Sequence, residues 1–463
     1  MSKGTRRLPL GIGGVGAAIV LGLGGASLAI GGKHDATKGV KANLSTKAPK
    51  NVIYLLGDGM GVSEVTAARY YQYGAGGRMN IDRLPFTGFD TTWSVKPGAG
   101  PDLLPDYDPD SASTGTMWAT GQKTIDERIS QGPSTAIDVP GENLPTVLEL
   151  AQKAGRKTGN VSTAEITDAT PAVLASHMSL RGCQGPEDTA EDCKTETKAA
   201  GGLGSIAEQM VDHKADVTLG GGLGRFEQKT DAGPTVVDDA KGLGYDVVED
   251  ASALAAADGS KPLLGLFNAS NMTTEWNGPQ ATLGAGTPAQ TCETGHRPAN
   301  EPSLSAMTSK ALELLDGSDK GFFLQVEGAS IDKQDHAANA CAQIGETVAF
   351  DDAIGVAMDY QASHPDTLVV VTADHSHTSQ IVSEDSEGED DPTGYSNNLT
   401  TVDGQTMRVT YGTAGGNPAA TAPPSQQHTG AAVPVFAAGP QASAVLGTND
   451  HTDKFALLQG KAE

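Results

Sequence analysis

Basic residues are scarce in this chain of 463 residues: 32 lysines and arginines face 57 aspartates and glutamates, and the net charge is −25 at pH 7. Three of the basic residues, Lys3, Arg6 and Arg7, lie at the extreme N-terminus, so the rest of the chain is more acidic still. Such a surface repels the phosphate backbone of nucleic acids, which excludes nucleic acid as a specific partner. It also repels small anions, so an enzyme for an anionic substrate needs local positive charge from metal ions or an arginine.

Cysteines are also few, and none of the four forms a Cys-x-x-Cys pair. Their spacing is wrong for a zinc site, whereas an even number in an exported chain indicates two disulfides. Three pairings are possible. The short separation favours Cys183 with Cys193, which leaves Cys292 with Cys341.

Only the N-terminus holds an apolar segment long enough to cross a bilayer. Residues 8–32 carry no charge and follow the three basic residues, and Ser27-Leu28-Ala29 offers a cleavage site. We therefore predict an export signal peptide over residues 1–29 and a polar tail over 30–49. The expected location is periplasmic, cell-wall or secreted, with no stable membrane contact once the leader is removed. The alternative is an uncleaved anchor, although many glycines and Pro9 make the segment a poor helix.

The rest of the chain alternates between predicted strands and helices. Short apolar runs without polar alternation are typical of strands buried on both faces, and helical spacing follows several of them. This order predicts an α/β fold: a three-layer sandwich with a large, mostly parallel central sheet and helices on both faces. No linker or repeat interrupts residues 50–463, so we expect a single domain with loops at 383–400 and 412–427. The expected strands are 52–56, 158–162, 217–219, 322–326 and 368–371, and the expected helices are 144–154 and 347–360.

Two Asp–His pairs follow predicted strands. Asp332 and His336 are four residues apart, so one helical turn can point both the same way. Asp374 and His375 are adjacent at a strand end, where the backbone turns. An isolated pair of this kind is usually a surface hydrogen bond, so each pair alone is weak evidence for a metal.

Further ligand types sit at other strand ends. Asp58 follows the first predicted strand and Glu327 closes a later one, and the carboxyl ends of parallel strands meet at one edge of a sheet. Carboxylates and imidazoles together are the ligands of divalent metals. Such ligands are usually oriented by hydrogen bonds from further residues, and we expect His377 to supply one. The pattern indicates a hydrolase with several metal ions rather than a binding module.

A nucleophile and an anion clamp are also present. Ser111 lies in a hydroxyl-rich segment, 110–116, at a predicted helix start, where free N–H groups and the helix dipole attract phosphate. The simpler interpretation is an N-cap, and no Gly-x-Ser-x-Gly elbow supports a hydrolase of the esterase type. Arg181, two residues before Cys183, is by itself an ordinary surface arginine, but on a disulfide-held loop its guanidinium could bind two phosphate oxygens.

Taken together, these segments resemble the bacterial alkaline phosphatases, the metal-dependent family with zinc, magnesium and a serine nucleophile. The resemblance rests most on the run 326–341 and on Ala373-Asp374-His375-Ser376-His377. The remaining matches, in family order, are 57–61, 110–113, 162–171 and 428–430.

The resemblance implies a function and a set of roles. The function is hydrolysis of phosphate monoesters to alcohol and phosphate through a phosphoserine on Ser111, with Arg181 binding the phosphate and Asp168 and Lys333 beside the site. Its cofactors are two zinc ions and one magnesium ion. The implied ligands are Asp332, His336 and His428 for one zinc, Asp58, Asp374 and His375 for the other, and Asp58, Thr170 and Glu327 for magnesium.

The same resemblance fits the cysteine pairing favoured above and implies a homodimer. Two alternatives remain at this point: a related phosphodiesterase or sulfatase on the same metal scaffold, and a noncatalytic secreted protein with structural metals. Sulfatases need a modifiable Cys or Ser in their own motif, and no cysteine stands at position 111.

Overall fold

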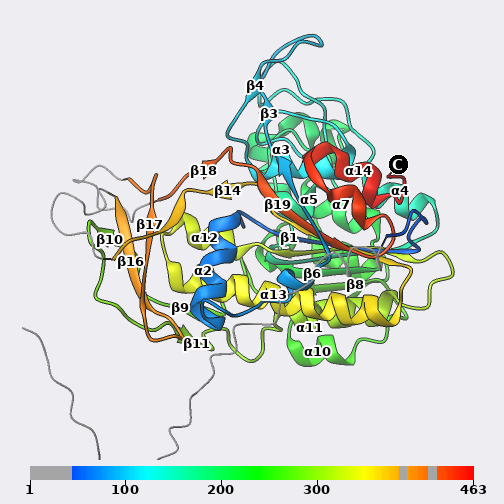
Figure 1. The fold of residues 1–463 in the computed structure, drawn as a ribbon. Helices are drawn as coiled ribbons and strands as arrows, with labels where there is room; N and C mark the ends of the chain where they lie inside the picture. Colours follow the sequence, from blue (N-terminus) through cyan, green and yellow to red (C-terminus); the bar gives the residue numbers. More distant parts are fainter. Residues whose placement is uncertain (1–43, 385–393, 416–424, 463) are drawn as a thin grey trace, which may run out of the picture. The chain divides into compact units, whose positions relative to one another are not determined.

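A ten-stranded β-sheet forms the middle layer of the protein in a computed structural model (Figure 1). The structure describes residues 44–384, 394–415 and 425–462, which all belong to one compact unit, Ala36–Glu463. The expected signal peptide and residues 30–43 of the expected tail lie outside these ranges. Within them, no helix combines the length and apolarity that crossing a membrane requires.

The central sheet is parallel except at one strand, β19, which runs antiparallel to both of its neighbours. The strand order is β20-β2-β19-β13-β1-β12-β5-β6-β8-β7. This sheet, with helices on both faces, confirms the predicted α/β three-layer fold. The strands are β1 Asn51–Gly57, β2 Phe86–Thr91, β5 Lys157–Glu165, β6 Val217–Gly221, β7 Asp246–Val248, β8 Leu263–Leu266, β12 Phe322–Gly328, β13 Thr367–Thr372, β19 Val433–Ala438 and β20 Gly447–Asp450.

Strand β1 shows why the sheet is covered on both faces. Its side chains alternate between two cores: Ile53 and Leu55 belong to one, and Val52, Tyr54 and Leu56 to the other. A strand with one solvent-exposed face would alternate apolar and polar residues, whereas residues 52–56 of β1 are all apolar. Burying each such side chain stabilises the fold by about 1.5–3 kcal/mol.

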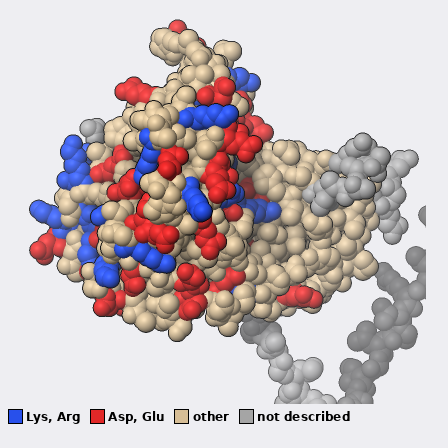
Figure 2. Space-filling view, turned by 180° about the vertical axis from the view of Figure 1, so that it is seen from behind, with Lys and Arg blue, Asp and Glu red and all other residues tan. Residues whose placement is uncertain are grey.

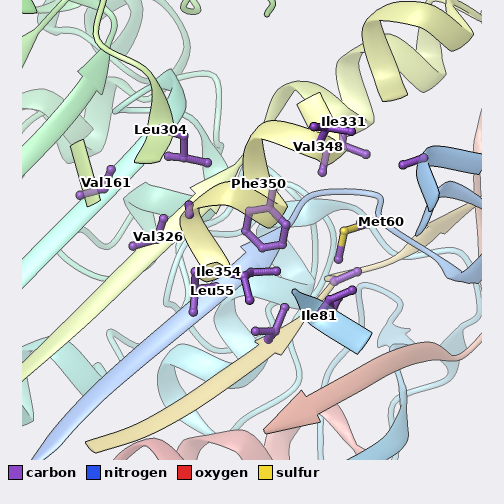
Figure 3. Packing of buried hydrophobic residues seen from close by; sticks show 14 of the residues in the cluster. Leu55, Met60, Ile81, Val161, Leu304, Val326, Ile331, Val348, Phe350 and Ile354 are labelled. Atoms are coloured by element: carbon purple, nitrogen blue, oxygen red, sulfur yellow. The ribbon is translucent and has the colours of Figure 1, made fainter. Parts of the chain in front are cut away.

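Helices supply the outer layers. Phe350 and Ile354 of α13 lie against Leu55 of β1 and Val326 of β12 (Figure 3). On the other face, Trp118 of α3 packs against Tyr54, with ring centroids 5.7 Å apart. The first face is covered by α2 Val62–Tyr73, α11 Leu304–Leu315 and α13 Ala340–Ser363, and the second by α3 Ser111–Thr120, α4 Val147–Lys153, α5 Ala169–Ala172, α7 Ile206–His213, α9 Val236–Gly242 and α14 Lys454–Leu458.

One predicted loop is partly wrong. Residues 395–400, at the end of the expected acidic loop, form strand β16 of a second, antiparallel sheet with order β10-β16-β17-β15. The acidic cluster misled the prediction, because the strand begins only after it. Residues 385–393 and 416–424, the centres of both expected loops, lie outside the described residues. The second sheet consists of β10 Thr282–Leu283, β15 Ser379–Val382, β16 Tyr395–Thr400 and β17 Thr406–Tyr411.

Acidic and basic side chains are interspersed on the face shown in Figure 2 rather than separated into blocks.

Among the described residues the predicted strands and helices are all present. The sheet extends beyond them on both sides, through β2, β19 and β20 at one edge and β8 and β7 at the other. The strands that carry the candidate site are the central ones, β13, β1, β12 and β5.

Candidate active site

Four adjacent parallel strands end at the same edge of the sheet, and each delivers a polar side chain there. Gly57 at the end of β1 pairs with Gly328 of β12, and Leu56 pairs with Thr372 of β13. The residues that follow these strands therefore emerge side by side, as expected for the carboxyl edge of an open α/β sheet.

The first cluster gathers three imidazoles around one carboxylate oxygen. Oδ1 of Asp332 lies 2.6 Å from Nε2 of His377, 3.3 Å from Nε2 of His336 and 3.4 Å from Nε2 of His428. The Nε2 atoms of His336 and His428 are 2.9 Å apart. Two facing imidazole nitrogens and a shared carboxylate form a donor set that zinc prefers.

Different elements bring these side chains together. Asp332 and His336 share helix α12, Ser330–His336, with the predicted four-residue spacing. His428 arrives from far along the chain, because β18, His428–Thr429, pairs with β14, Ser376–His377, and sets His428 opposite His377. The Nδ1 atoms of His336 and His428 face the carbonyl oxygens of Gln426 and Pro109, so both Nε2 atoms are turned to the cluster.

The second cluster adjoins the candidate nucleophile. Nε2 of His375 lies 3.3 Å from Oδ2 of Asp374, 3.4 Å from Oδ1 of Asp58 and 3.2 Å from Oγ of Ser111. Gly59 makes this approach possible: its φ is +67°, its N–H donates to Oδ1 of Asp374 at 2.9 Å, and a Cβ there would meet the His377 ring at 2.7 Å. Only glycine fits that position without strain.

The third group lies between β12, β5 and α5. The Ser162 hydroxyl on β5 donates to Oε2 of Glu327, its register partner on β12. The backbone carbonyl of Thr170 accepts from Gln325, which shares a strand face with Glu327. The Thr170 hydroxyl is buried and has no hydrogen-bond partner within the described residues.

Buried negative charge makes the edge suited to cations. Burial, reinforced by neighbouring carboxylates, raises the pKa of Asp58 well above its usual value. Burial likewise raises the pKa of Asp374, and it raises that of Glu327 to about 8. One oxygen of Asp58 and one of Asp374 have no hydrogen-bond donor among the described residues. Carboxylates arranged in this way are costly unless cations neutralise them, so the donor set fits divalent metals.

A charged network borders these clusters. Arg181 donates from Nη1 to Asp110 at 3.2 Å and from Nη2 to Asp168 at 2.9 Å, and Lys333 donates to the other oxygen of Asp168 at 2.7 Å. Burial acts to raise the pKa of Asp168, but the charges of Lys333 and Arg181 outweigh it and hold the pKa far below its usual range. The aspartate therefore stays ionised and fixes both cations in place.

Two disulfides are present, between Cys183 and Cys193 and between Cys292 and Cys341. This is the pairing that the resemblance implies. The first one closes the segment that follows Arg181 and so restrains the loop that carries the guanidinium. No free cysteine remains among the described residues.

Several contributors were missed by the sequence analysis. Asp110 is the N-cap of α3: its carboxylate accepts from the backbone N–H of Ser113 at 2.9 Å and also holds Arg181. Ser111 is the first residue of that helix, as expected. Asp110 and Ser162 both lie inside the matching motifs, but nothing local shows that they contact Arg181 and Glu327. Gln426 acts through its backbone carbonyl, which leaves no signal in a sequence.

An open α/β sheet with histidines and carboxylates gathered beside a serine hydroxyl defines the class of metal-dependent hydrolases. The family model for alkaline phosphatase matches residues 49–422, and the chain belongs to the alkaline phosphatase family. Members of this family depend on metal ions, and the chain is a phosphoric monoester hydrolase.

The relatives cover almost the whole chain. The alkaline phosphatase of Escherichia coli K12 is 45% identical over 436 residues, which span 92% of this chain and 88% of that protein. The streptomycin-6-phosphate phosphatase of Streptomyces griseus is 46% identical over 422 residues, 88% of this chain and 89% of its own length. In fold, the alkaline phosphatase of the Antarctic bacterium TAB5 is similar with a TM-score of 0.65 at 22% identity, covering 90% of this chain and 99% of its own.

Proposed function

We propose that this enzyme cleaves phosphate monoesters through a phosphoserine formed on Ser111, at a centre of two zinc ions and one magnesium ion. One observation carries the proposal: Oγ of Ser111 lies 3.2 Å from Nε2 of His375, which itself lies within 3.4 Å of the carboxylates of Asp58 and Asp374. Ser111, whose hydroxyl lies beside this cluster at the start of α3, is also the residue that the resemblance implies as the nucleophile.

Three sets of side chains would hold the metals. The unpartnered oxygens of Asp58, Thr170 and Asp374 and the converging imidazoles support this assignment. When bound, zinc supplies positive charge that lowers the pKa of an adjacent hydroxyl or water and neutralises a departing alkoxide. The proposed sets are Asp332, His336 and His428 for the first zinc, Asp58, Asp374 and His375 for the second, and Asp58, Thr170 and Glu327 for magnesium. His377 would orient Asp332 by its hydrogen bond.

The residues of the chain then position and transfer the phosphoryl group. The Ser111 hydroxyl gives its proton to solvent and its Oγ attacks phosphorus, the new bond forms as the ester P–O bond breaks, and the departing alkoxide takes a proton from water to leave as the alcohol. A water attacks the phosphoserine from the side of the departed alcohol, and the Ser111 hydroxyl is restored with release of phosphate. Two in-line displacements invert the phosphorus twice, so the net stereochemistry is retention.

Arg181 is suited to hold the phosphoryl oxygens. Its two terminal nitrogens each use one N–H on Asp110 and Asp168, which leaves a second N–H on each for the substrate. Asp168 and Lys333 fix the direction of the guanidinium. Donors aimed at the non-bridging oxygens stabilise the charge that develops in the transition state.

The relative turnover of different esters distinguishes a phosphatase from a phosphodiesterase and from a sulfatase. With purified enzyme, we expect turnover of an aryl phosphate monoester to exceed that of the matching phosphodiester and sulfate ester by orders of magnitude, and to stop when a chelator removes the metals. Faster turnover of the diester or the sulfate would overturn the proposal, and activity that survives complete metal removal would overturn its metal centre. Acid-quenched labelling with phosphate should trap a phosphoenzyme in the wild type and none in Ser111→Ala.

The substrate range is a separate question. The Streptomyces griseus relative is named for one phosphate ester, streptomycin 6-phosphate, and it is as similar to this chain as the alkaline phosphatase of Escherichia coli K12. Because the proposed contacts reach the phosphoryl group and the departing oxygen, and none reaches the rest of the alcohol, we propose a broad range of monoesters. A kcat/KM for streptomycin 6-phosphate far above those for aryl and alkyl phosphates would show a specialised enzyme instead.

The organisation of the chain follows the same proposal. We propose removal of residues 1–29 on export, a tail over 30–49, a single catalytic domain over 50–463 and a homodimeric state. Mass spectrometry of the protein recovered outside the cytoplasm tests the cleavage site, and sedimentation tests the dimer.

A further inference from the structure

A second group of metal-type ligands lies apart from the residues described above. Glu149 comes from α4, His177 from the segment after α5, and His213 is the last residue of α7. One donor atom from each lies within 4.8 Å of the other two. We infer that Oε1 of Glu149, Nε2 of His177 and Nε2 of His213 form a zinc site outside the catalytic centre.

The distances between the ligand atoms fit a zinc ion with tetrahedral coordination. Oε1 of Glu149 lies 3.1 Å from Nε2 of His177 and 3.5 Å from Nε2 of His213. With zinc–ligand bonds of about 2.0–2.1 Å, the edge of a ligand tetrahedron is roughly 3.3 Å. Two nitrogens and one carboxylate oxygen are a preferred set for zinc, with the fourth position left to water. The side chains of Glu149 and His213 are about a quarter exposed, at 25% and 23%, so water can reach that position.

Two of the three donor atoms, those of His177 and Glu149, are turned to the site because the rest of each side chain is already hydrogen-bonded. Nδ1 of His177 faces the carbonyl oxygen of Ser130 at 2.8 Å, which is the usual support for a metal-bound imidazole. Oε2 of Glu149 accepts from the N–H of Thr146 at 2.9 Å in a capping box, which leaves Oε1 for the histidines.

The backbone around the site is also fixed. Gln209 of α7 accepts from the N–H of His177 at 2.9 Å and donates to its carbonyl at 3.0 Å, while Gln152 of α4 donates to the carbonyl of His213 at 3.0 Å. Both ring nitrogens of His177 face hydrogen-bond acceptors, and a neutral imidazole can donate from only one of them. A cation at Nε2 satisfies the second pairing.

The site adjoins the segment that carries Arg181. Met178, next to His177, exchanges two backbone hydrogen bonds of 3.0 Å with Ile129, and the Arg181 N–H donates to the Glu127 carbonyl at 2.7 Å. A zinc ion at His177 would tie α4 and α7 to the base of this segment. Its role is structural bracing, not a step of the reaction.

The test compares the zinc content of purified full-length enzyme after dialysis against a micromolar excess of free Zn²⁺. We expect wild type to retain one more zinc per chain than His213→Ala, and Glu149→Gln to show the same loss while its amide oxygen preserves the capping box. His364→Ala is the matched control, because His364 also ends a helix and faces a single carboxylate, Asp316 at 3.8 Å, without a third ligand among the described residues. Its zinc content should equal that of wild type.

Equal zinc content in wild type, His213→Ala and Glu149→Gln would overturn the site and leave His177 in direct hydrogen-bond contact with Ser130 and Glu149. The Glu149→Gln result decides the question if His213→Ala does not fold. Because the readout is metal content and not turnover, the outcome is independent of the catalytic proposal. An enzyme without phosphatase activity would still show the extra zinc.

Discussion

Replacement of Arg181 tests the proposed phosphate clamp most directly. The guanidinium has one N–H free on each terminal nitrogen, and each hydrogen bond to a charged phosphate oxygen contributes about 1.5–3 kcal/mol. Arg181→Ala should therefore lower kcat/KM for an aryl phosphate by roughly 10²- to 10⁴-fold. Arg181→Lys should recover part of this loss, because an ammonium keeps the charge but not the two-pronged geometry.

The fold should survive this change, since the partners of Arg181 keep other donors. Asp168 retains Lys333 at 2.7 Å and the N–H of Ala169 at 2.8 Å, and Asp110 retains two backbone N–H groups. The loss should therefore appear in function and not in the yield of folded protein.

The assay is steady-state hydrolysis together with competitive inhibition by inorganic phosphate, whose inhibition constant should rise along with the loss of kcat/KM. Arg69→Ala is the control, because it breaks a comparable two-bond pair with Asp82, at 2.6 and 2.8 Å, away from the strand ends that hold the site. An inhibition constant for phosphate that stays within about threefold of wild type in Arg181→Ala would refute the clamp.

Three further predictions concern metal, covalent and protonation states. Glu327→Gln should lower the magnesium content measured by elemental analysis while sparing zinc; unchanged magnesium would remove Glu327 from the ligand set. Replacing both Cys292 and Cys341 by alanine opens a sequence separation of 49 residues and should lower the free energy of unfolding by about 4 kcal/mol in denaturant titrations; a loss below about 1 kcal/mol would show that the bridge constrains little. Burial raises the pKa of Asp351 to about 6, so the folded state holds this proton to higher pH than the unfolded state does. The stability that the proton confers is present below about pH 4 and is lost as the pH rises through about 6. The free energy of unfolding of wild type should therefore fall by about 2 kcal/mol relative to that of Asp351→Asn between about pH 4 and pH 8. Parallel plots of unfolding free energy against pH for the two proteins would contradict this.

The amino-acid sequence by itself determined the central layer and many of the side chains that gather at its carboxyl edge. Continuous apolar runs identify strands buried on both faces, as at residues 52–56, and such runs alternating with helices leave few topologies. The four-residue spacing of Asp332 and His336 and the position of Asp58 after a strand are local features, so neither depends on distant parts of the chain. Helical and strand periodicity are set within a few residues, which is why they can be read directly.

Only the tertiary structure decided which distant residues meet. The β14–β18 ladder sets His428 opposite His377, the antiparallel β19 extends the sheet beyond β13, and Asp110 meets Arg181 across a separation of 71 residues. The trio of Glu149, His177 and His213 has no motif at all, because its members come from two separate helices and the segment after α5. Pairings of this kind depend on how whole layers pack, and packing is selected by the combined shape and burial of many side chains rather than by the spacing of any two.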